Sequence, residues 1–118
     1  MTADISSPPD KQQPDNTTDP ILTIVIISYN TRDLLNQSIG SLLNNTKCKS
    51  LEIIVVDNAS KDSSVEMLNH HWPQVRTICN PTNVGFAKAV NQALRLSRGQ
   101  FILLLNPDTY IEVGAIDQ

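Results

Sequence analysis

The chain has 118 residues, enough for one small domain. Nine Lys and Arg residues against twelve Asp and Glu residues give a net charge of −3, and no basic cluster stands out, which argues against binding to nucleic acid. Apolar residues make up 40% of the chain and aromatic residues only 4%, so we expect a core of Ile, Leu, Val and Ala, the usual filling of a buried parallel sheet.

The first 20 residues differ in composition from the rest. They carry four of the seven prolines and few apolar side chains, so they cannot bury enough surface to offset the entropy of ordering them. We therefore expect a disordered leader over residues 1–20 and one folded domain over residues 21–118. The leader lacks the regions of a signal peptide, and the longest nearly apolar run, Ile21–Ile27, is far shorter than a membrane span of about 20 residues. These features predict a cytoplasmic protein with no membrane span in this chain.

Strands and helices are predicted to alternate from residue 22 onward. Short apolar runs rich in β-branched residues indicate strands, and apolar side chains spaced three and four apart indicate helices. In chain order we expect a strand at 22–27, a helix with its N-cap at Thr31, a strand at 51–56, a helix at 62–69, a strand at 75–79, a helix from 86 to a C-cap at Gly99, a strand at 101–105 and a helix at 113–118. Ser63 and Glu66 have the spacing of a capping box for the second helix.

This alternation predicts an α/β fold in which a mostly parallel sheet has helices on both faces. Right-handed crossovers bring the carboxyl ends of the strands to one edge of such a sheet, and ligands bind along that edge. Functional side chains are therefore expected directly after the strands.

Polar residues do follow three of the four predicted strands, as Ser28-Tyr29-Asn30, Asp57-Asn58-Ala59-Ser60 and Asn106-Pro107-Asp108. Asn, Asp and Ser are also ordinary turn residues, but a turn requires neither an aromatic ring nor a carboxylate directly after a buried strand. The glycine motifs of dinucleotide-binding domains and P-loops are absent. A divalent cation at Asp108 is the candidate for neutralising bound phosphates, since Mg²⁺ needs only one or two carboxylates beside substrate phosphates.

Four segments together resemble the successive motifs of family 2 glycosyltransferases of the GT-A fold, namely Ile24–Asn30, Ile54–Ser60, Asn83–Asn91 and Leu103–Asp108. They occur in the order and spacing of that family, and the resemblance covers Ile21–Gln118. It implies a three-layer α/β sandwich, truncated here after the fourth strand. It also implies inverting transfer of a sugar from a nucleoside-diphosphate sugar to an acceptor hydroxyl, in cell-wall or polysaccharide biosynthesis.

The resemblance assigns roles to individual residues. The nucleotide base and ribose are held after the first two strands, which maps onto Ser28, Tyr29, Asn30 and Asp57. The third motif closes the pocket beside the donor, which maps onto Asn83, Gly85 and Asn91.

The motif after the fourth strand binds the metal, Mg or Mn, so Asp108 is the expected ligand. Asn106 would either offer its carbonyl oxygen or bond a water. The chain has Val90 where many members have arginine, and Asn106-Pro107-Asp108 where many have D-x-D. Both departures resemble the rhamnosyltransferase-like branch.

This branch implies a dTDP- or UDP-sugar donor, a polysaccharide or lipid-linked acceptor and a place at the cytoplasmic membrane face.

The family's catalytic base lies beyond the position of Gln118, so we expect this chain to bind donor without transferring sugar. Two alternatives stay open: a catalytically silent nucleotide-sugar-binding module or gene fragment, and a receiver-like signalling domain. The second would need an acidic pair where Ser28-Tyr29-Asn30 stands.

Overall fold

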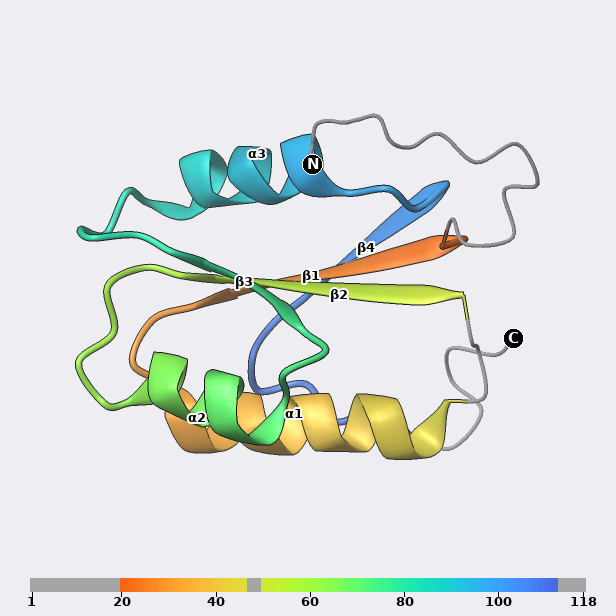
Figure 1. The fold of residues 1–118 in the computed structure, drawn as a ribbon, viewed down its shortest axis with the longest axis horizontal. Helices are drawn as coiled ribbons and strands as arrows, with labels where there is room; N and C mark the ends of the chain where they lie inside the picture. Colours follow the sequence, from red (N-terminus) through yellow and green to blue (C-terminus); the bar gives the residue numbers. More distant parts are fainter. Residues whose placement is uncertain (1–19, 47–49, 113–118) are drawn as a thin grey trace.

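The computed structural model describes residues 20–46 and 50–112. Within these ranges the elements are β1 (Leu22–Ser28), α1 (Arg32–Asn45), β2 (Leu51–Asp57), α2 (Ser64–His71), β3 (Arg76–Cys79), α3 (Phe86–Leu96) and β4 (Phe101–Leu105). The strands form one parallel sheet in the order β3-β2-β1-β4, with α1 and α2 on one face and α3 on the other (Figure 1). The predicted α/β fold with a parallel sheet is confirmed.

The two central strands supply most of the core, because their apolar runs are covered on both faces. Side chains alternate between the faces of a strand, so each strand feeds two clusters. The cluster under α1 and α2 includes Ile24, Ile26 and Val55. The cluster under α3 includes Val25, Ile54 and Val56, packed against Ala89 and Ala93. The two alanines are the only fully buried side chains of α3 and allow its backbone to lie close to the sheet.

The strand β4 is entered through a tight contact at Gly99. The Gly99 amide donates to Thr23 Oγ1 at 2.9 Å, and a Cβ on this glycine would lie 2.6 Å from the Thr23 backbone nitrogen. Close approach to β1 therefore explains the glycine. The predicted C-cap role of Gly99 is wrong, because α3 ends at Leu96 and its C-cap is Ser97.

A buried carboxylate joins the strands at their amino ends. The Glu52 side chain is 5% exposed and accepts hydrogen bonds from Thr23 Oγ1 at 2.8 Å and from Arg76 Nη1 at 3.0 Å. It also accepts from the backbone N–H of Arg98 at 2.9 Å, just before β4. A buried charge is costly unless it is hydrogen-bonded, and the several donors to Glu52 offset this cost. The same hydrogen bonds connect β1, β2 and β3 to the segment that leads into β4.

The start of α1 was predicted correctly in position but not in mechanism, and the start of α2 was predicted two residues too early. Thr31 is the N-cap of α1, yet its hydroxyl shares a hydrogen bond with Ser28 and caps no backbone N–H. The capping box of α2 is wrong, because Ser63 is left-handed with φ of 68° and makes no side-chain cap. Asp62 takes that part by accepting from the Ser64 amide at 3.2 Å, so α2 begins at Ser64 and not at Asp62.

Two predictions fall outside the described residues: the leader over residues 1–19 and the helix at 113–118. Pro20, which we assigned to the leader, is buried. In the part of the chain that the structure describes, no helix combines the length and apolar character that crossing a membrane requires.

Candidate functional site

The carboxyl ends of three strands place Ser28, Asp57 and Cys79 in one row. The pairing aligns Ser28 with Asp57 and Asp57 with Cys79, and side chains at paired positions lie on the same face of the sheet. Asp57 is 2% exposed, and its Oδ2 accepts from the Ser60 amide at 2.9 Å. Its Oδ1 is buried and receives no hydrogen bond from any of the described residues. A buried carboxylate oxygen is costly without a donor, so this atom is suited to accept from a ligand.

The two loops beside Asp57 are fastened to each other. The Asn30 amide donates to Ser60 Oγ at 2.8 Å, and Asn30 Oδ1 accepts from the Lys61 amide at 2.7 Å. Three residues of these loops are left-handed, Asn30 with φ of 54°, Ala59 with 67° and Ser63 with 68°. Such backbone strain concentrates at binding and active sites, where the surrounding contacts hold it in place.

Asp62 adds a third link between the same loops. Its Oδ2 accepts from the Arg32 amide at 2.9 Å, and its Oδ1 accepts from the Ser64 amide and hydroxyl. Burial alone would raise the pKa of Asp62, but the Ser64 hydroxyl and the two amides outweigh it, so the pKa lies below the ordinary value of 3.8. The ionised form of Asp62 therefore holds the start of α1 against the start of α2.

A network of side-chain amides that we did not predict holds the loop before α3. Asn80 Nδ2 donates to Asn58 Oδ1 at 2.9 Å, and Asn80 exchanges two hydrogen bonds of 2.9 Å with Gln92. Asn58 Nδ2 donates to the Gly85 carbonyl at 3.3 Å, and Asn83 Oδ1 accepts from the Gly85 amide at 2.9 Å. Asn80 directly follows β3, so the rule that polar residues after strands are functional would have singled it out.

The structure does not bring every predicted residue to Asp57. Ser28 is fully buried and its hydroxyl is engaged by Thr31. Tyr29 is half exposed beside this row. Asn91 lines a separate hollow of about 290 Å³ on α3, together with Val84, Lys88, Gln92 and Arg95.

Asn106 and Asp108 occupy an exposed turn after β4, closed by a hydrogen bond of 3.1 Å from the Thr109 amide to the Asn106 carbonyl. Amide and carboxylate oxygens suit Mg²⁺ or Mn²⁺. The described residues contain no group of three or more His, Cys, Asp or Glu able to enclose a metal. The turn by itself therefore offers two side-chain oxygen ligands to a cation.

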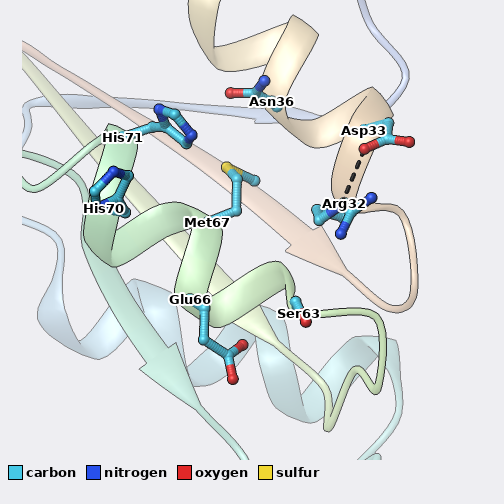
Figure 2. Close-up of a pocket in the computed structure, with 8 residues that line it drawn as sticks. All are labelled: Arg32, Asp33, Asn36, Ser63, Glu66, Met67, His70 and His71. Atoms are coloured by element: carbon cyan, nitrogen blue, oxygen red, sulfur yellow. Dashed lines mark hydrogen bonds and ion pairs between the residues drawn. The ribbon is translucent and has the colours of Figure 1, made fainter.

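A second hollow, of about 370 Å³, lies between α1 and α2. Figure 2 shows Arg32 and Asp33 of α1 at one end, joined by an ion pair of 3.0 Å, and His70 and His71 of α2 at the other. The two histidine rings meet edge to face at 5.0 Å. Because the side chains at the two ends do not converge on one point, we assign no site to this hollow.

The structure is thus an open parallel α/β sheet with a buried acid and cross-linked polar loops at its carboxyl edge, which is the edge where sheets of this class bind ligands. The model of the family described as "Glycosyl transferase family 2" matches residues 23–117. The chain belongs to this family.

Similar proteins agree with this assignment. The chain is 38% identical over 100 residues to a poly(ribitol-phosphate) beta-glucosyltransferase of Bacillus spizizenii, covering 80% of this chain and 16% of that protein. It is 34% identical over 92 residues to the UDP-Glc:alpha-D-GlcNAc-diphosphoundecaprenol beta-1,3-glucosyltransferase WfaP of Escherichia coli, covering 76% of this chain and 36% of that protein.

Among solved structures, S. aureus TarS 1-349 in complex with UDP matches with a TM-score of 0.70 and 25% identity, over 78% of this chain and 28% of that one. The predicted GT-A fold is confirmed. The chain spans between about a sixth and just over a third of the length of these relatives.

Proposed function

We propose that this chain binds the donor of a glycosyltransferase, a nucleoside-diphosphate sugar, at the carboxyl edge of β1 and β2. The observation that carries the proposal is the buried Asp57 Oδ1, which has no donor among the described residues. A nucleobase N–H or a ribose hydroxyl would supply the donor. The family assignment and the UDP held by TarS support this class of ligand.

The other residues of this edge divide into ligand contacts and supports. Tyr29 is exposed enough to lie against a base, and an aromatic ring offers apolar area at low entropy cost. Asn30 acts mainly as a support, since its amide and Oδ1 fasten the two loops. Loops fixed before binding lower the cost of ordering them with the ligand. Asn83 and Gly85 shape the loop that borders the site, and Asn91 follows on α3.

Asp108 and Asn106 would hold Mg²⁺ or Mn²⁺ together with the diphosphate of the donor. When bound, the cation supplies positive charge to the leaving diphosphate. The chain's own part is to present two oxygen ligands on a turn closed by the Thr109 amide.

For the longer protein we propose inverting transfer of the sugar to an acceptor hydroxyl of a polysaccharide or lipid-linked chain. The names of the two glucosyltransferase relatives support such acceptors. Transfer needs a general base near the acceptor hydroxyl, and we assign none of the described residues to that role. We place the base in the part of the domain that this chain does not span.

Calorimetric titration of the purified chain with UDP, dTDP and GDP, with Mg²⁺ or Mn²⁺ and then with a chelator, tests the proposal. One nucleotide is expected to bind, UDP or dTDP if the rhamnosyltransferase-like interpretation holds. Asp57→Ala should weaken binding by at least about tenfold, the value of one hydrogen bond to a charged group. Asp108→Ala should abolish the difference between metal and chelator.

Glu66→Ala is the matched control, because it removes an exposed carboxylate from α2 and should leave the affinity unchanged. Equal binding by wild type and Asp57→Ala would refute the assigned site. Failure of a folded chain to bind any of the three nucleotides would refute the proposed function.

A further inference from the structure

Cys79 ends β3 and is the neighbour of Asp57 across the sheet. The two residues are paired in register, and adjacent strands lie about 4.8 Å apart. Both side chains therefore stand on the same face of the sheet, at its carboxyl edge. Sequence reasoning offered no function for this thiol, because 22 positions separate it from Asp57 in the chain.

Exposure to solvent differs along the row of paired residues, which consists of Ser28, Asp57 and Cys79. Ser28 is fully buried and bonded to Thr31, and Asp57 Oδ2 is taken by the Ser60 amide. Of the three residues in the row, only Cys79 is exposed. Asp57, whose Oδ1 has no hydrogen-bond partner among the described residues, therefore has an exposed neighbour on its β3 side.

The backbone that follows Cys79 is held by hydrogen bonds, which keep Cys79 next to Asp57. The Asn80 amide donates to the Asp57 carbonyl at 2.9 Å. The Asn80 side chain is held at the same time by Asn58 and Gln92.

The pKa of Cys79 is consistent with a position close to Asp57. Its pKa is raised, first by partial burial and then by the negative charge of Asp57. A charge effect of the carboxylate on the thiol agrees with the distance that the strand pairing implies.

We propose that the Cys79 thiol forms the β3 wall of the nucleotide pocket, so that a group attached to its sulfur and a bound nucleotide exclude each other. The inference rests on the proposed function, because it concerns the ligand that reaches Asp57 Oδ1. It makes Cys79 both a contact that limits which nucleotides fit and a site at which modification switches off donor binding.

N-ethylmaleimide is a suitable probe, since the reaction needs no oxidant. The Cys79 sulfur, after losing its proton to solvent, adds to one carbon of the maleimide double bond. A carbon–sulfur bond forms, the π bond breaks, and the other carbon takes a proton from water. The chain has two cysteines, so Cys48→Ser leaves Cys79 as the only thiol and Cys79→Ser leaves Cys48 as the matched control.

The first measurement is the rate of alkylation, followed by intact mass, with and without UDP. At about ten times its Kd, UDP should slow alkylation of Cys79 in the Cys48→Ser protein by about tenfold. Alkylation of Cys48 in the Cys79→Ser protein should proceed at the same rate with and without UDP.

The second measurement is UDP affinity after complete alkylation of the Cys48→Ser protein, with a thermal melt to show that the adduct is folded. Affinity should fall by at least about tenfold. It should fall less with methyl methanethiosulfonate, because the Cys79 thiolate then takes only a methylthio group as a disulfide while methanesulfinate leaves. The control is a comparison within the Cys79→Ser protein, whose UDP affinity should be the same before and after treatment. The first measurement starts from unmodified, folded protein. It therefore tests whether UDP and the alkylating group exclude each other even if the alkylated protein is unstable.

The outcomes separate this inference from the proposed function. If UDP binds the Cys48→Ser protein but gives no protection of Cys79, the inference is overturned and the proposed function stands. If no nucleotide binds the folded, unmodified protein, the proposed function fails and the inference fails with it.

Discussion

Two strands of similar composition, β2 and β4, have opposite environments. Ile54, Val55 and Val56 of β2 are fully buried, whereas Phe101 is 65% exposed, Ile102 45% and Leu104 42%. The strand β2 has neighbours on both sides and helices over both faces, whereas β4 pairs only with β1 among the strands described. The comparison shows that an apolar run predicts a strand, and that neighbouring elements decide whether its side chains are buried. An apolar edge strand of this kind is a surface on which other strands pair.

The largest expected effect on stability comes from shortening one isoleucine to alanine, and it should differ between β2 and β4. Ile54→Ala should lower the free energy of unfolding by about 3 kcal/mol, because it leaves a cavity under α3. Ile102→Ala should lower it by less than about 1 kcal/mol, since this side chain is already half in water. Urea unfolding of both variants measures the difference. Equal losses would contradict the burial contrast between β2 and β4.

A smaller effect is expected at the one point where the β4 region is tightly packed. Gly99→Ala would place a Cβ 2.6 Å from the Thr23 backbone nitrogen and should cost about 1–3 kcal/mol. Gly40→Ala in α1 is the control, because its Cβ would meet only Trp72 at 3.6 Å. It should be neutral or stabilising by up to about 1 kcal/mol, as alanine favours a helix. If both variants unfold alike, the close approach of Gly99 to β1 is not a constraint.

The smallest effect is expected from the polar links beside β1 and β2, and it depends on pH. The folded-state pKa of Asp62 is lowered, so its contribution to stability is fully present above 3.8 and is lost as pH falls through the folded value. Asp62→Asn should therefore be less stable than wild type near neutral pH, and the gap should close below pH 3.8. Thermal melts at several pH values measure it. A gap that stays constant into acid, or that Asp33→Asn reproduces, would argue against this link.

Much of the architecture could be predicted because it depends on local patterns. The strand at 101–105 was predicted with its observed bounds, and the strands at 22–27 and 51–56 each extend by one residue in the structure. The helix at 62–69 begins two residues later than expected, because Asp62 and not Ser63 accepts from its first amide, and it also ends two residues later. A capping box needs a backbone conformation that residue spacing does not reveal.

The candidate site was predictable only in part. Asp57 was singled out because a carboxylate directly follows a buried run. The structure shows that Asp57 is buried and that its Oδ1 accepts no hydrogen bond from the described residues. The amide network of Asn58, Asn80 and Gln92 was not found, because hydrogen bonds across 12 and 22 positions leave no periodic pattern. The expected roles in donor binding all stay predictions, for Ser28, Tyr29, Asn30, Asp57, Asn83, Gly85, Asn91, Asn106 and Asp108.

The sequence by itself determined the alternation of strands and helices, the edge of the sheet at which polar residues follow the strands, and the motifs of the glycosyltransferase family. These follow from residue types at short separations, where side-chain periodicity and turn chemistry act. Only the tertiary structure decided that β4 is an exposed edge, that Ser28 is buried while Cys79 is exposed, and that Asp57 Oδ1 has no donor in the described chain. Each of these depends on which distant segments pack together, and burial and hydrogen bonding between strands are properties of that packing.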